Sequence, residues 1–339
     1  MVSPASGKKP GSKDVAEAAG VSRTTVSFVL NDTPNISIPE STRRRVWAAA
    51  HALGYQPFPE ARALRAGRSD IVLCLLPDWP ITGPVGEVLK QVSALLSTHG
   101  LTMLTHQKRP GEEVARVLGA LTPAAIVAMC DLDESEVEFI ERRGLELRAW
   151  MGHVPGHPDI ASLRQLDIGR LQARTLSQLG HKRLAYVAPS DLRLDWFSRP
   201  RLEGARQEAD ALGLTVTDFR IPGEDTDALS RWLRAAVASG MSGICAYNDE
   251  VAFSVLMAAL DAGIAVPDQL SVLGVDDSFI SRSSRPSIST IAFDLARGAE
   301  RLATLLTDLA VPETAASADR NPVMGVILRD STAPRGAEV

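Results

Sequence analysis

The sequence is poor in the residue patterns that build covalent or catalytic sites. Its three cysteines, Cys74, Cys130 and Cys245, each lie inside an apolar run and never form a CxxC pair, which argues against disulfides, zinc binding and redox chemistry. The six histidines show no HExxH or similar spacing, and neither a P-loop nor a GxGxxG after a strand occurs. We therefore expect no catalytic residues, no metal ligands and no cofactor, and we expect the cysteines to be buried as small hydrophobic residues.

Long apolar runs and a targeting segment are also missing from the sequence. The first 13 residues carry charge but no apolar core of signal-peptide length, and no later run approaches the roughly 18 apolar residues that a membrane helix needs. Hydrophobic residues make up 45% and charged residues 23% of the 339 positions, as in a globular fold with two or three cores. We therefore expect a cytoplasmic protein.

Charge is divided unevenly along the chain. Residues 1–69 hold ten Lys and Arg residues against five acidic ones, whereas the remaining residues hold 26 against 36. A basic front part suits a polyanion such as DNA, and the acidic remainder repels it. A basic tail that only aids solubility is the simpler alternative, so the front residues must be judged by their pattern.

The pattern of residues 13–31 predicts two short helices separated by a tight turn. Gly20 marks the turn, and Ser22 is a good N-cap for the second helix because its hydroxyl can accept a backbone N–H two or three residues on. Apolar spacings of i, i+3 and i+4 predict the contact between the two helices. The residues expected to meet there are Val15, Ala18, Ala19, Val26, Val29 and Leu30.

The second of these helices has a polar outer side that fits the major groove of DNA. A third helix follows near Pro39, begins with three arginines and closes a small core. This spacing also fits any small helical bundle, but the local basic surplus favours a DNA reader. The outward residues of the second helix are Arg23, Thr24, Ser27, Phe28 and Asn31, and the core positions of the third are Val46, Ala49, Ala50 and Leu53.

Beyond Gly67, short apolar runs alternate with longer amphipathic stretches. One stretch keeps an apolar helical face from Val85 to Leu96 and ends at His99-Gly100. The runs are typical of buried parallel strands, so we predict a doubly wound α/β fold that binds ligands at the carboxyl ends of its strands. Roughly 260 residues exceed one sheet of this kind, which predicts two lobes. The predicted strands are residues 71–76, 101–106, 124–129, 183–188, 243–247 and 270–275.

Several segments together resemble the lactose-repressor/galactose-repressor (LacI/GalR) family of transcriptional regulators. In the front part these are DVAEAAGVS, TVSFVLN, GYQP and EARALRAG, and further on they include RLEGA, YNDEVAF, GIAVPDQLSVLGVDD and RPSIST. The resemblance implies an all-α helix-turn-helix headpiece and an effector domain similar to periplasmic sugar-binding proteins, with two doubly wound parallel-sheet lobes. It also implies a homodimer that binds a palindromic double-stranded DNA operator and acts as a repressor.

The same resemblance assigns roles to the outward residues of the second helix. Base-reading positions are held by Arg23, Thr24 and Phe28. Phosphate-contacting positions are held by Ser22, Ser27 and Asn31. Phe28 can either touch a thymine methyl group or pack inward, and both alternatives stay open.

Residues 58–66 match the family's hinge helix, which forms in the DNA minor groove on the operator. Leu64 holds the position that wedges between central base pairs, beside Ala61 and Arg62. A helix of about nine residues is marginal in water, so it would need DNA and a partner hinge to form. A plain linker is the alternative.

Arg201, Asn248 and Asp276 match the family's effector contacts. An arginine, an amide and a carboxylate supply donors and acceptors that fit neighbouring hydroxyls of a sugar or nucleoside. The alternatives are that Asn248 and Asp276 cap the segments that follow them, and that Arg201 is a surface charge. Trp79 and Trp196 lie near strand ends and each could cover a sugar face or pack between the lobes.

These expectations define an allosteric regulator in which a small molecule between the lobes changes operator affinity. The domain limits that we predict are a disordered tail at 1–12, the DNA-binding domain at 13–57, a hinge at 58–69, the effector and dimerisation domain at 70–330, and a tail at 331–339. Within the effector domain, lobe 1 is expected at about 70–163 and 293–322, and lobe 2 at about 164–292 and 323–330.

Overall fold

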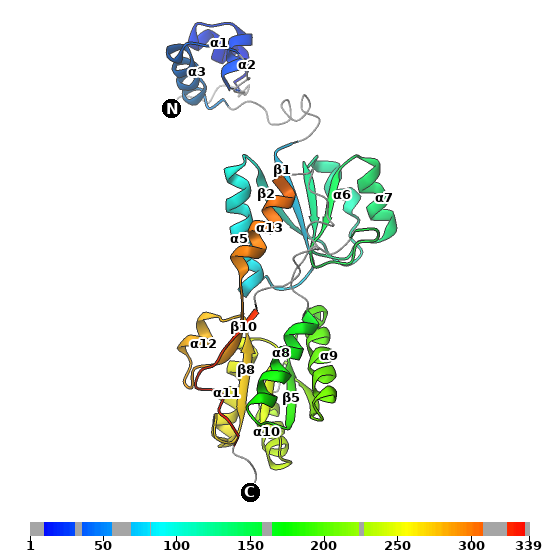
Figure 1. Ribbon diagram of the computed structural model, residues 1–339. Helices are drawn as coiled ribbons and strands as arrows, with labels where there is room; N and C mark the ends of the chain where they lie inside the picture. Colours follow the sequence, from blue (N-terminus) through cyan, green and yellow to red (C-terminus); the bar gives the residue numbers. More distant parts are fainter. Residues whose placement is uncertain are drawn as a thin grey trace, which may run out of the picture. The chain divides into compact units, whose positions relative to one another are not determined.

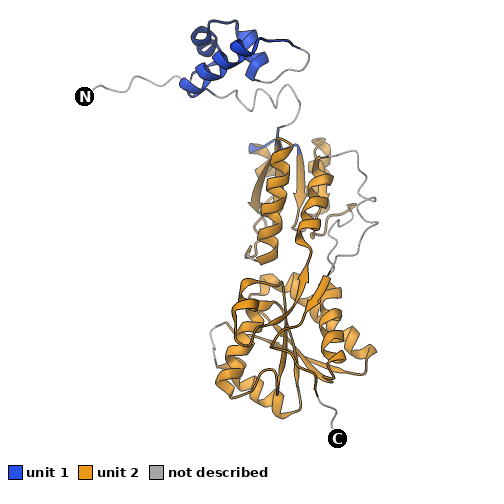
Figure 2. Ribbon diagram, turned by 60° about the vertical axis from the view of Figure 1, so that its left-hand side comes forward, with its two compact units in different colours: residues 1–70, 120–124 blue, residues 71–119, 125–339 orange. Residues whose placement is uncertain are grey.

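The structure is a computed structural model that describes residues 10–30, 36–55, 69–81, 83–157, 165–223, 227–307 and 324–335. The chain divides into two compact units (Figure 2). The first comprises residues 1–70 with 120–124, and the second comprises residues 71–119 with 125–339. In the described part of the chain, no helix combines the length and apolar composition that crossing a bilayer requires.

The first unit contains a three-helix headpiece with one small apolar core. Its helices are α1 (Ser12–Ala19), α2 (Arg23–Leu30) and α3 (Glu40–Ala52). The predicted core is largely confirmed, but Ala18 is exposed and Ala16 is buried in its place. The reason is geometric: at about 100° per residue, Val15, Ala19 and Ala16 share one arc, and Ala18 lies about 60° outside it. The buried residues are Val15, Ala16, Ala19, Val26, Val29, Leu30, Val46 and Ala50, with Ala49 and Leu53 packed against them.

The second unit holds two sheets, and the first of these has four parallel strands in the order β2-β1-β3-β4. The central strand β1 is buried along almost its whole length, as expected for a strand with helices on both faces. Helix α13, from late in the sequence, packs against α5 beside this sheet (Figure 1). The elements are β1 (Ile71–Leu76), α5 (Gly83–Thr98), β2 (Thr102–Gln107), α6 (Val114–Ala120), β3 (Ala125–Ala128), α7 (Glu134–Arg142), β4 (Glu146–Ala149) and α13 (Leu295–Thr307).

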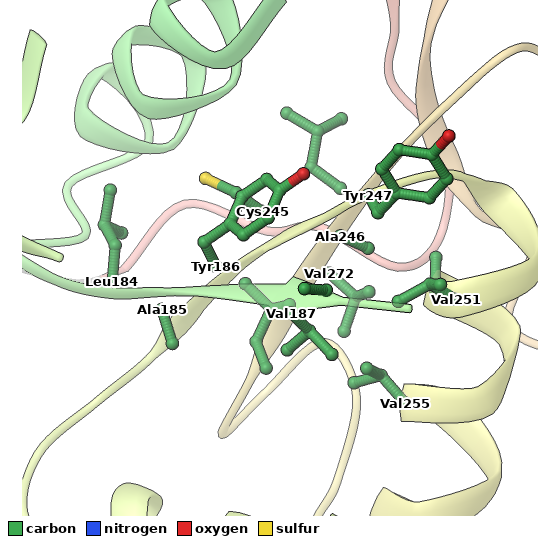
Figure 3. Packing of buried hydrophobic residues seen from close by; sticks show 14 of the residues in the cluster. Leu184, Ala185, Tyr186, Val187, Cys245, Ala246, Tyr247, Val251, Val255 and Val272 are labelled. Carbon is green, nitrogen blue, oxygen red and sulfur yellow. The ribbon is translucent and has the colours of Figure 1, made fainter. Parts of the chain in front are cut away.

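Among the described residues, the second sheet has six strands in the order β10-β9-β8-β7-β5-β6, of which only β10 runs antiparallel to its neighbour. Side chains of β5, β7 and β8 form its core on both faces: Val187 lies on the side of helix α11, and Tyr186 points to the opposite face, where its hydroxyl lies 3.3 Å from Ser198 Oγ (Figure 3). The strands are β5 (Arg183–Ala188), β6 (Thr215–Arg220), β7 (Gly243–Ala246), β8 (Ser271–Val275), β9 (Ser289–Phe293) and β10 (Met324–Ile327). The helices are α8 (Gln165–Gln178), η1 (Leu192–Leu194), α9 (Asp195–Ala211), α10 (Ala228–Ala238), α11 (Asp249–Ala262) and α12 (Phe279–Ser283).

The predicted doubly wound α/β fold is confirmed, and all six predicted strands are present. The amphipathic helix predicted from Val85 is α5, and Gly100 follows it with a left-handed φ of 72°. Strands β4, β6, β9 and β10 were not predicted. β4 and β10 have four residues each, and β4, β6 and β9 carry polar or charged residues among the apolar ones. The three cysteines are free and buried, and burial raises the pKa of Cys74 and Cys245 to about 12. The numerical domain limits stay predictions.

Candidate functional site

Local bonds fix the angle between helices α1 and α2. Gly20 ends α1 in the left-handed conformation with φ 64°, and the N–H of Val21 donates to the Ala16 carbonyl at 3.0 Å. Ser22 then starts α2, because its Oγ accepts the backbone N–H of Thr25 at 3.0 Å. The turn between the two helices is therefore encoded by residues within a few positions of one another.

Helix α2 exposes the beginning of its predicted DNA face. Ser22, Arg23 and Thr24 are exposed, whereas Ser27 and Phe28 are half-buried. The exposure of Phe28 fits both alternatives for its ring, so its role stays open. The predicted site residues that lie outside the described part of the chain are Asn31, Ala61, Arg62 and Leu64.

Arg201 lies in helix α9 and is only 5% exposed, which excludes the surface-charge alternative. Its Nε donates to Gln165 Oε1 at 2.8 Å, and its Nη1 donates to the Tyr247 carbonyl at 2.5 Å. The guanidinium also lies 4.8 Å from the centre of the Tyr247 ring. These contacts hold a buried cation in one orientation and satisfy part of its hydrogen-bonding capacity.

Two glycines bring the helix of Arg201 against its neighbour. Gly169 of α8 and Gly204 of α9 lie where the two helices cross. A Cβ at Gly169 would overlap the Arg201 carbonyl, and a Cβ at Gly204 would overlap the Leu166 carbonyl. The absence of side chains at this crossing therefore sets the depth at which Arg201 lies.

Asn248 is the N-cap of helix α11 and follows the end of β7 by two residues, so it has the capping role that was its predicted alternative. Its Oδ1 accepts the backbone N–H of Val251 at 2.9 Å, and its Nδ2 donates to Glu250 Oε2 at 2.7 Å. The cap fixes the side chain at the carboxyl end of the strand. Tyr247, the residue before it, connects this strand end to Arg201 through its carbonyl and its ring.

Asp276 follows β8 and has a left-handed φ of 105°. Its backbone N–H donates to the Ile291 carbonyl at 2.8 Å. Burial raises the pKa of its carboxyl to about 7; the neighbouring acids Asp249 and Glu250 add to this, while Arg201 opposes it. Arg201 and Asp276 therefore interact electrostatically at the carboxyl end of this sheet.

The two predicted tryptophans lie together with Phe197 in one aromatic cluster. Trp79, which follows β1, is 7% exposed, and its ring centre lies 4.3 Å from that of Phe197 and 6.4 Å from that of Trp196. Trp196 is 42% exposed and meets the Phe197 ring edge-on at 4.8 Å. Trp79, which follows a strand of the first sheet, thus packs against Phe197 beside the second sheet. Its Nε1 is buried with no hydrogen-bond partner among the described residues. Trp196 keeps a partly free ring.

Sequence reasoning missed several residues that hold this site in place. Gln165 and Tyr247 bind Arg201, and Gln107 Nε2 donates to the Trp79 carbonyl at 3.1 Å. An ion pair of 3.7 Å joins Asp78 to Arg193. Tyr247 could have been found, because it directly precedes Asn248 at a strand end. The others have no local signal, since their partners lie far away in sequence.

Comparisons with known proteins match both parts of this arrangement. Residues 13–57 match the family described as bacterial regulatory proteins, lacI family, and residues 173–332 match the periplasmic binding protein-like domain. The regulator GalS of Salmonella typhimurium is 30% identical over 324 residues, which cover 91% of each chain. The regulator DegA of Bacillus subtilis is 28% identical and covers 85% of this chain and 88% of its own.

Solved structures show the same fold. A lac repressor dimer bound to operator and the anti-inducer ONPF has a TM-score of 0.73 at 20% identity, covering 96% of this chain and all of its own. A complex of the transcriptional regulator CelR with cellobiose has a TM-score of 0.60 at 23% identity, covering 95% and 99%. With its helix-turn-helix headpiece, its two-sheet periplasmic-binding-protein-like domain and these relatives, the chain belongs to the lacI family of bacterial transcriptional regulators.

Proposed function

We propose that the protein is a repressor that binds a palindromic operator as a homodimer, and that a small molecule, most simply a sugar, controls its affinity for that operator. The observation that carries the DNA half is the Ser22-capped helix α2 with Arg23 and Thr24 exposed at its start. A helix whose first residues are free can bring them to base edges in the major groove. The protein thus works by binding and not by catalysis, and a chromosome-binding regulator belongs in the cytoplasm.

The ligand half rests on a set of polar groups at the carboxyl ends of β7 and β8, of which Arg201 is buried while Asn248 and Asp276 are half-buried. Arg201 offers donors, Asp276 offers acceptors, and Asn248 adds an amide at the adjoining strand end. We propose that Trp196 covers one face of the ligand with the exposed part of its ring, while Trp79 contributes mainly packing. Support for a sugar comes from CelR, whose structure contains cellobiose, and from an Alkaliphilus metalliredigens relative whose structure contains D-xylulofuranose.

The dimer is supported by apolar side chains that lie exposed on neighbouring helices. Phe279 of α12 is 83% exposed, and Met257 and Leu260 lie exposed three residues apart on α11, which contacts α12. Such surface is typical of a protein interface. We propose that a second copy covers it, and that the two-fold pair matches the two half-sites of a palindrome.

The proposal also includes the domain limits and the DNA contacts of the hinge and the headpiece. We propose the DNA-binding domain at residues 13–57, a hinge at 58–69 and the effector domain at 70–330. Within the hinge, Leu64 would enter the minor groove with Ala61 and Arg62 beside it. Asn31, Ser22 and Ser27 would contact phosphates.

Replacement of Arg23 tests the DNA half. An inverted-repeat duplex is first selected from a random pool with the full-length protein. Arg23→Ala should weaken binding to that duplex by about 1–3 kcal/mol and relax one base position, with a smaller loss on a random duplex. Arg206→Gln, which removes a surface arginine paired with Asp218 on the second sheet, serves as the control and should bind like the parent. Equal losses on both duplexes for Arg23→Ala would contradict the base-reading role.

A thermal-shift screen of sugars and nucleosides tests the ligand half. A ligand at 100 times its Kd stabilises the folded state by about 2.7 kcal/mol. Any binding compound should lose its effect in Arg201→Gln and should change the affinity for the selected duplex in the parent protein. The sign of that change distinguishes induction from co-repression. A compound that shifts Tm but leaves DNA affinity unchanged would contradict allosteric control.

A further inference from the structure

Two consecutive aspartates after β8 adopt backbone conformations that residues with a Cβ rarely hold. The φ angles of Asp276 and Asp277 are 105° and 47°. Such conformations persist only where the surrounding structure restrains them, and they gather at functional sites. The segment of residues 276–278, here called the ligand loop, therefore needs an external restraint.

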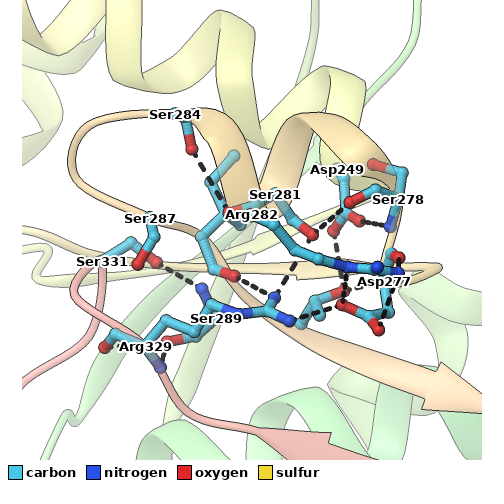
Figure 4. A network of polar contacts seen from close by, with 12 residues as sticks. Asp249, Asp277, Ser278, Ser281, Arg282, Ser284, Ser287, Ser289, Arg329 and Ser331 are labelled. Atoms are coloured by element: carbon cyan, nitrogen blue, oxygen red, sulfur yellow. Dashed lines mark hydrogen bonds and ion pairs between the residues drawn. The ribbon is translucent and has the colours of Figure 1, made fainter.

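Arg329 supplies one such restraint. Its guanidinium pairs with Asp277 Oδ1 at 2.5 Å, and it donates to Ser281 Oγ at 3.2 Å and to the Ile288 carbonyl at 2.8 Å (Figure 4). Its side chain is 17% exposed, whereas Arg282, which also contacts Asp277, is 60% exposed. The rigid fork of guanidinium donors lets this one half-buried side chain join the ligand loop, helix α12 and the residue before β9.

Asp249 supplies the second restraint from the opposite side of the loop. It is almost fully buried at the start of α11, and its Oδ2 accepts the backbone N–H of Ser278 at 2.7 Å. Its Oδ1 accepts the Thr290 hydroxyl at 2.7 Å, and that hydroxyl oxygen accepts the N–H of Asp277 at 3.2 Å. Gly274 makes room for this carboxylate, because a Cβ there would overlap Asp249 Oδ1.

We propose that Arg329 and Asp249 are positioning residues that hold the ligand loop in the conformation that presents the Asp276 carboxylate to the ligand. This inference rests on the ligand role proposed above for Asp276. Neither residue meets the ligand in this arrangement, since both act through the backbone and side chain of the loop. We call the set Asp249, Asp277, Thr290 and Arg329 the loop clasp.

The position of Arg329 in the chain gives the loop clasp a further consequence. Arg329 follows β10, and the chain reaches β10 after α13, which packs on α5 beside the first sheet. Because β10 pairs with β9, the clasp joins a residue just after this edge strand to the ligand loop.

Hydrogen exchange on the full-length protein, with neither DNA nor effector, tests the clasp. Arg329→Met should speed exchange at the amides of Asp277 and Ser278 by about tenfold or more, because local opening no longer breaks an ion pair, while β7 amides keep their protection. Arg329→Lys retains the charge and should restore part of the protection. Arg282→Met is the matched control, because it removes the exposed partner of the same aspartate, and its effect should be much smaller.

Two results would overturn the proposal. One is equal exchange at the ligand loop in Arg329→Met and Arg282→Met, and the other is a uniform rise across the whole sheet, which a merely structural role would produce. Should Arg329→Met fail to fold, Asp277→Asn removes the same charge pair with little change in shape. It should give the same local opening.

The pH dependence of the unfolding free energy that Asp276 causes is a second test, because a general loss of stability would not change it. The pH dependence of unfolding is compared between parent and Asp276→Asn, and again between the same pair in the Arg329→Met background. A released loop exposes Asp276 to water, so the pH-dependent difference should shrink by half or more in that background. An unchanged difference would show that Arg329 does not position Asp276.

These measurements separate the two proposals, because neither uses a ligand or an operator. A failed exchange experiment would remove the clasp and leave the regulator proposal intact. A sugar and nucleoside screen without any binding compound would instead count against the ligand role while the clasp stands.

Discussion

The headpiece and the second sheet hold their polar groups in opposite ways. In the headpiece, Ser22 receives its bond from Thr25, three residues away, and Arg23 and Thr24 point into solvent. Beside the second sheet, Arg201 of helix α9 is buried and bound by residues 36 and 46 positions away. A surface that meets DNA can be built from short-range bonds, whereas a site that must exclude water needs partners from several distant elements.

Burial also changes the chemistry of the two regions. The polar face of α2 stays hydrated until DNA displaces the water, so its side chains carry no cost of burial beforehand. Asp276 is half-buried already, and the loss of water around its carboxyl raises its pKa to about 7. A ligand that donates hydrogen bonds to this carboxylate would stabilise its ionised form, and its binding would therefore stabilise the folded state.

The largest expected effect concerns Asp276. Its folded-state pKa lies above the ordinary value of 3.8, so its ionisation destabilises the fold increasingly as pH rises from about 4 to 7. Asp276→Asn should therefore gain unfolding free energy relative to the parent between pH 5 and pH 8, by about 3 kcal/mol. Urea unfolding across that range measures the difference.

Asp330→Asn is the control for this titration. The Ser287 hydroxyl lowers the pKa of the exposed Asp330 carboxyl, so ionised Asp330 stabilises the fold above its ordinary pKa, and that contribution is lost only as pH falls below it. No gain between pH 5 and pH 8 is expected in this variant. A gain equal to that of Asp276→Asn would mean that general charge, not burial, sets the effect.

A smaller effect is expected from a substitution that forces helices α8 and α9 apart where they cross. Gly169→Ala forces a Cβ into the Arg201 carbonyl, so the helices must separate, at a cost of about 2 kcal/mol. Gly298→Ala in α13 is the matched control, because a Cβ there meets nothing and alanine favours a helix; it should stabilise by about 0.5–1 kcal/mol. Thermal unfolding of both variants compares them, and equal signs would contradict the close-contact explanation.

The smallest effect belongs to the headpiece. Ser22→Ala removes the cap of α2 and should cost about 1 kcal/mol of local stability, which hydrogen exchange at the Thr25 and Val26 amides measures. Thr24→Ala lies beside it on the exposed face and should leave that exchange unchanged. If both variants opened α2 equally, the short-range encoding of this helix would be wrong.

The sequence predicted more of the headpiece than of the larger unit, because the headpiece is built from short-range signals. Helix spacing predicted nearly the whole headpiece core. It named Ala18, three residues after Val15, where the structure buries Ala16, the residue next to Val15. In the larger unit the continuous apolar runs gave six strands. The edge strands β4 and β6 escaped, because their residues mix polar and apolar types.

The amino-acid sequence by itself determined the elements whose signals are local: the capped turn at Ser22, the buried strands and the amphipathic α5. Resemblance added Arg201, Asn248 and Asp276 as candidate ligand contacts. Only the tertiary structure decided that Arg201 is clamped between Gln165 and Tyr247, and that Arg329 fastens the loop of Asp276. Those contacts join residues dozens of positions apart, and no periodicity reaches that far, because it is the packing of helices and sheets that brings them together.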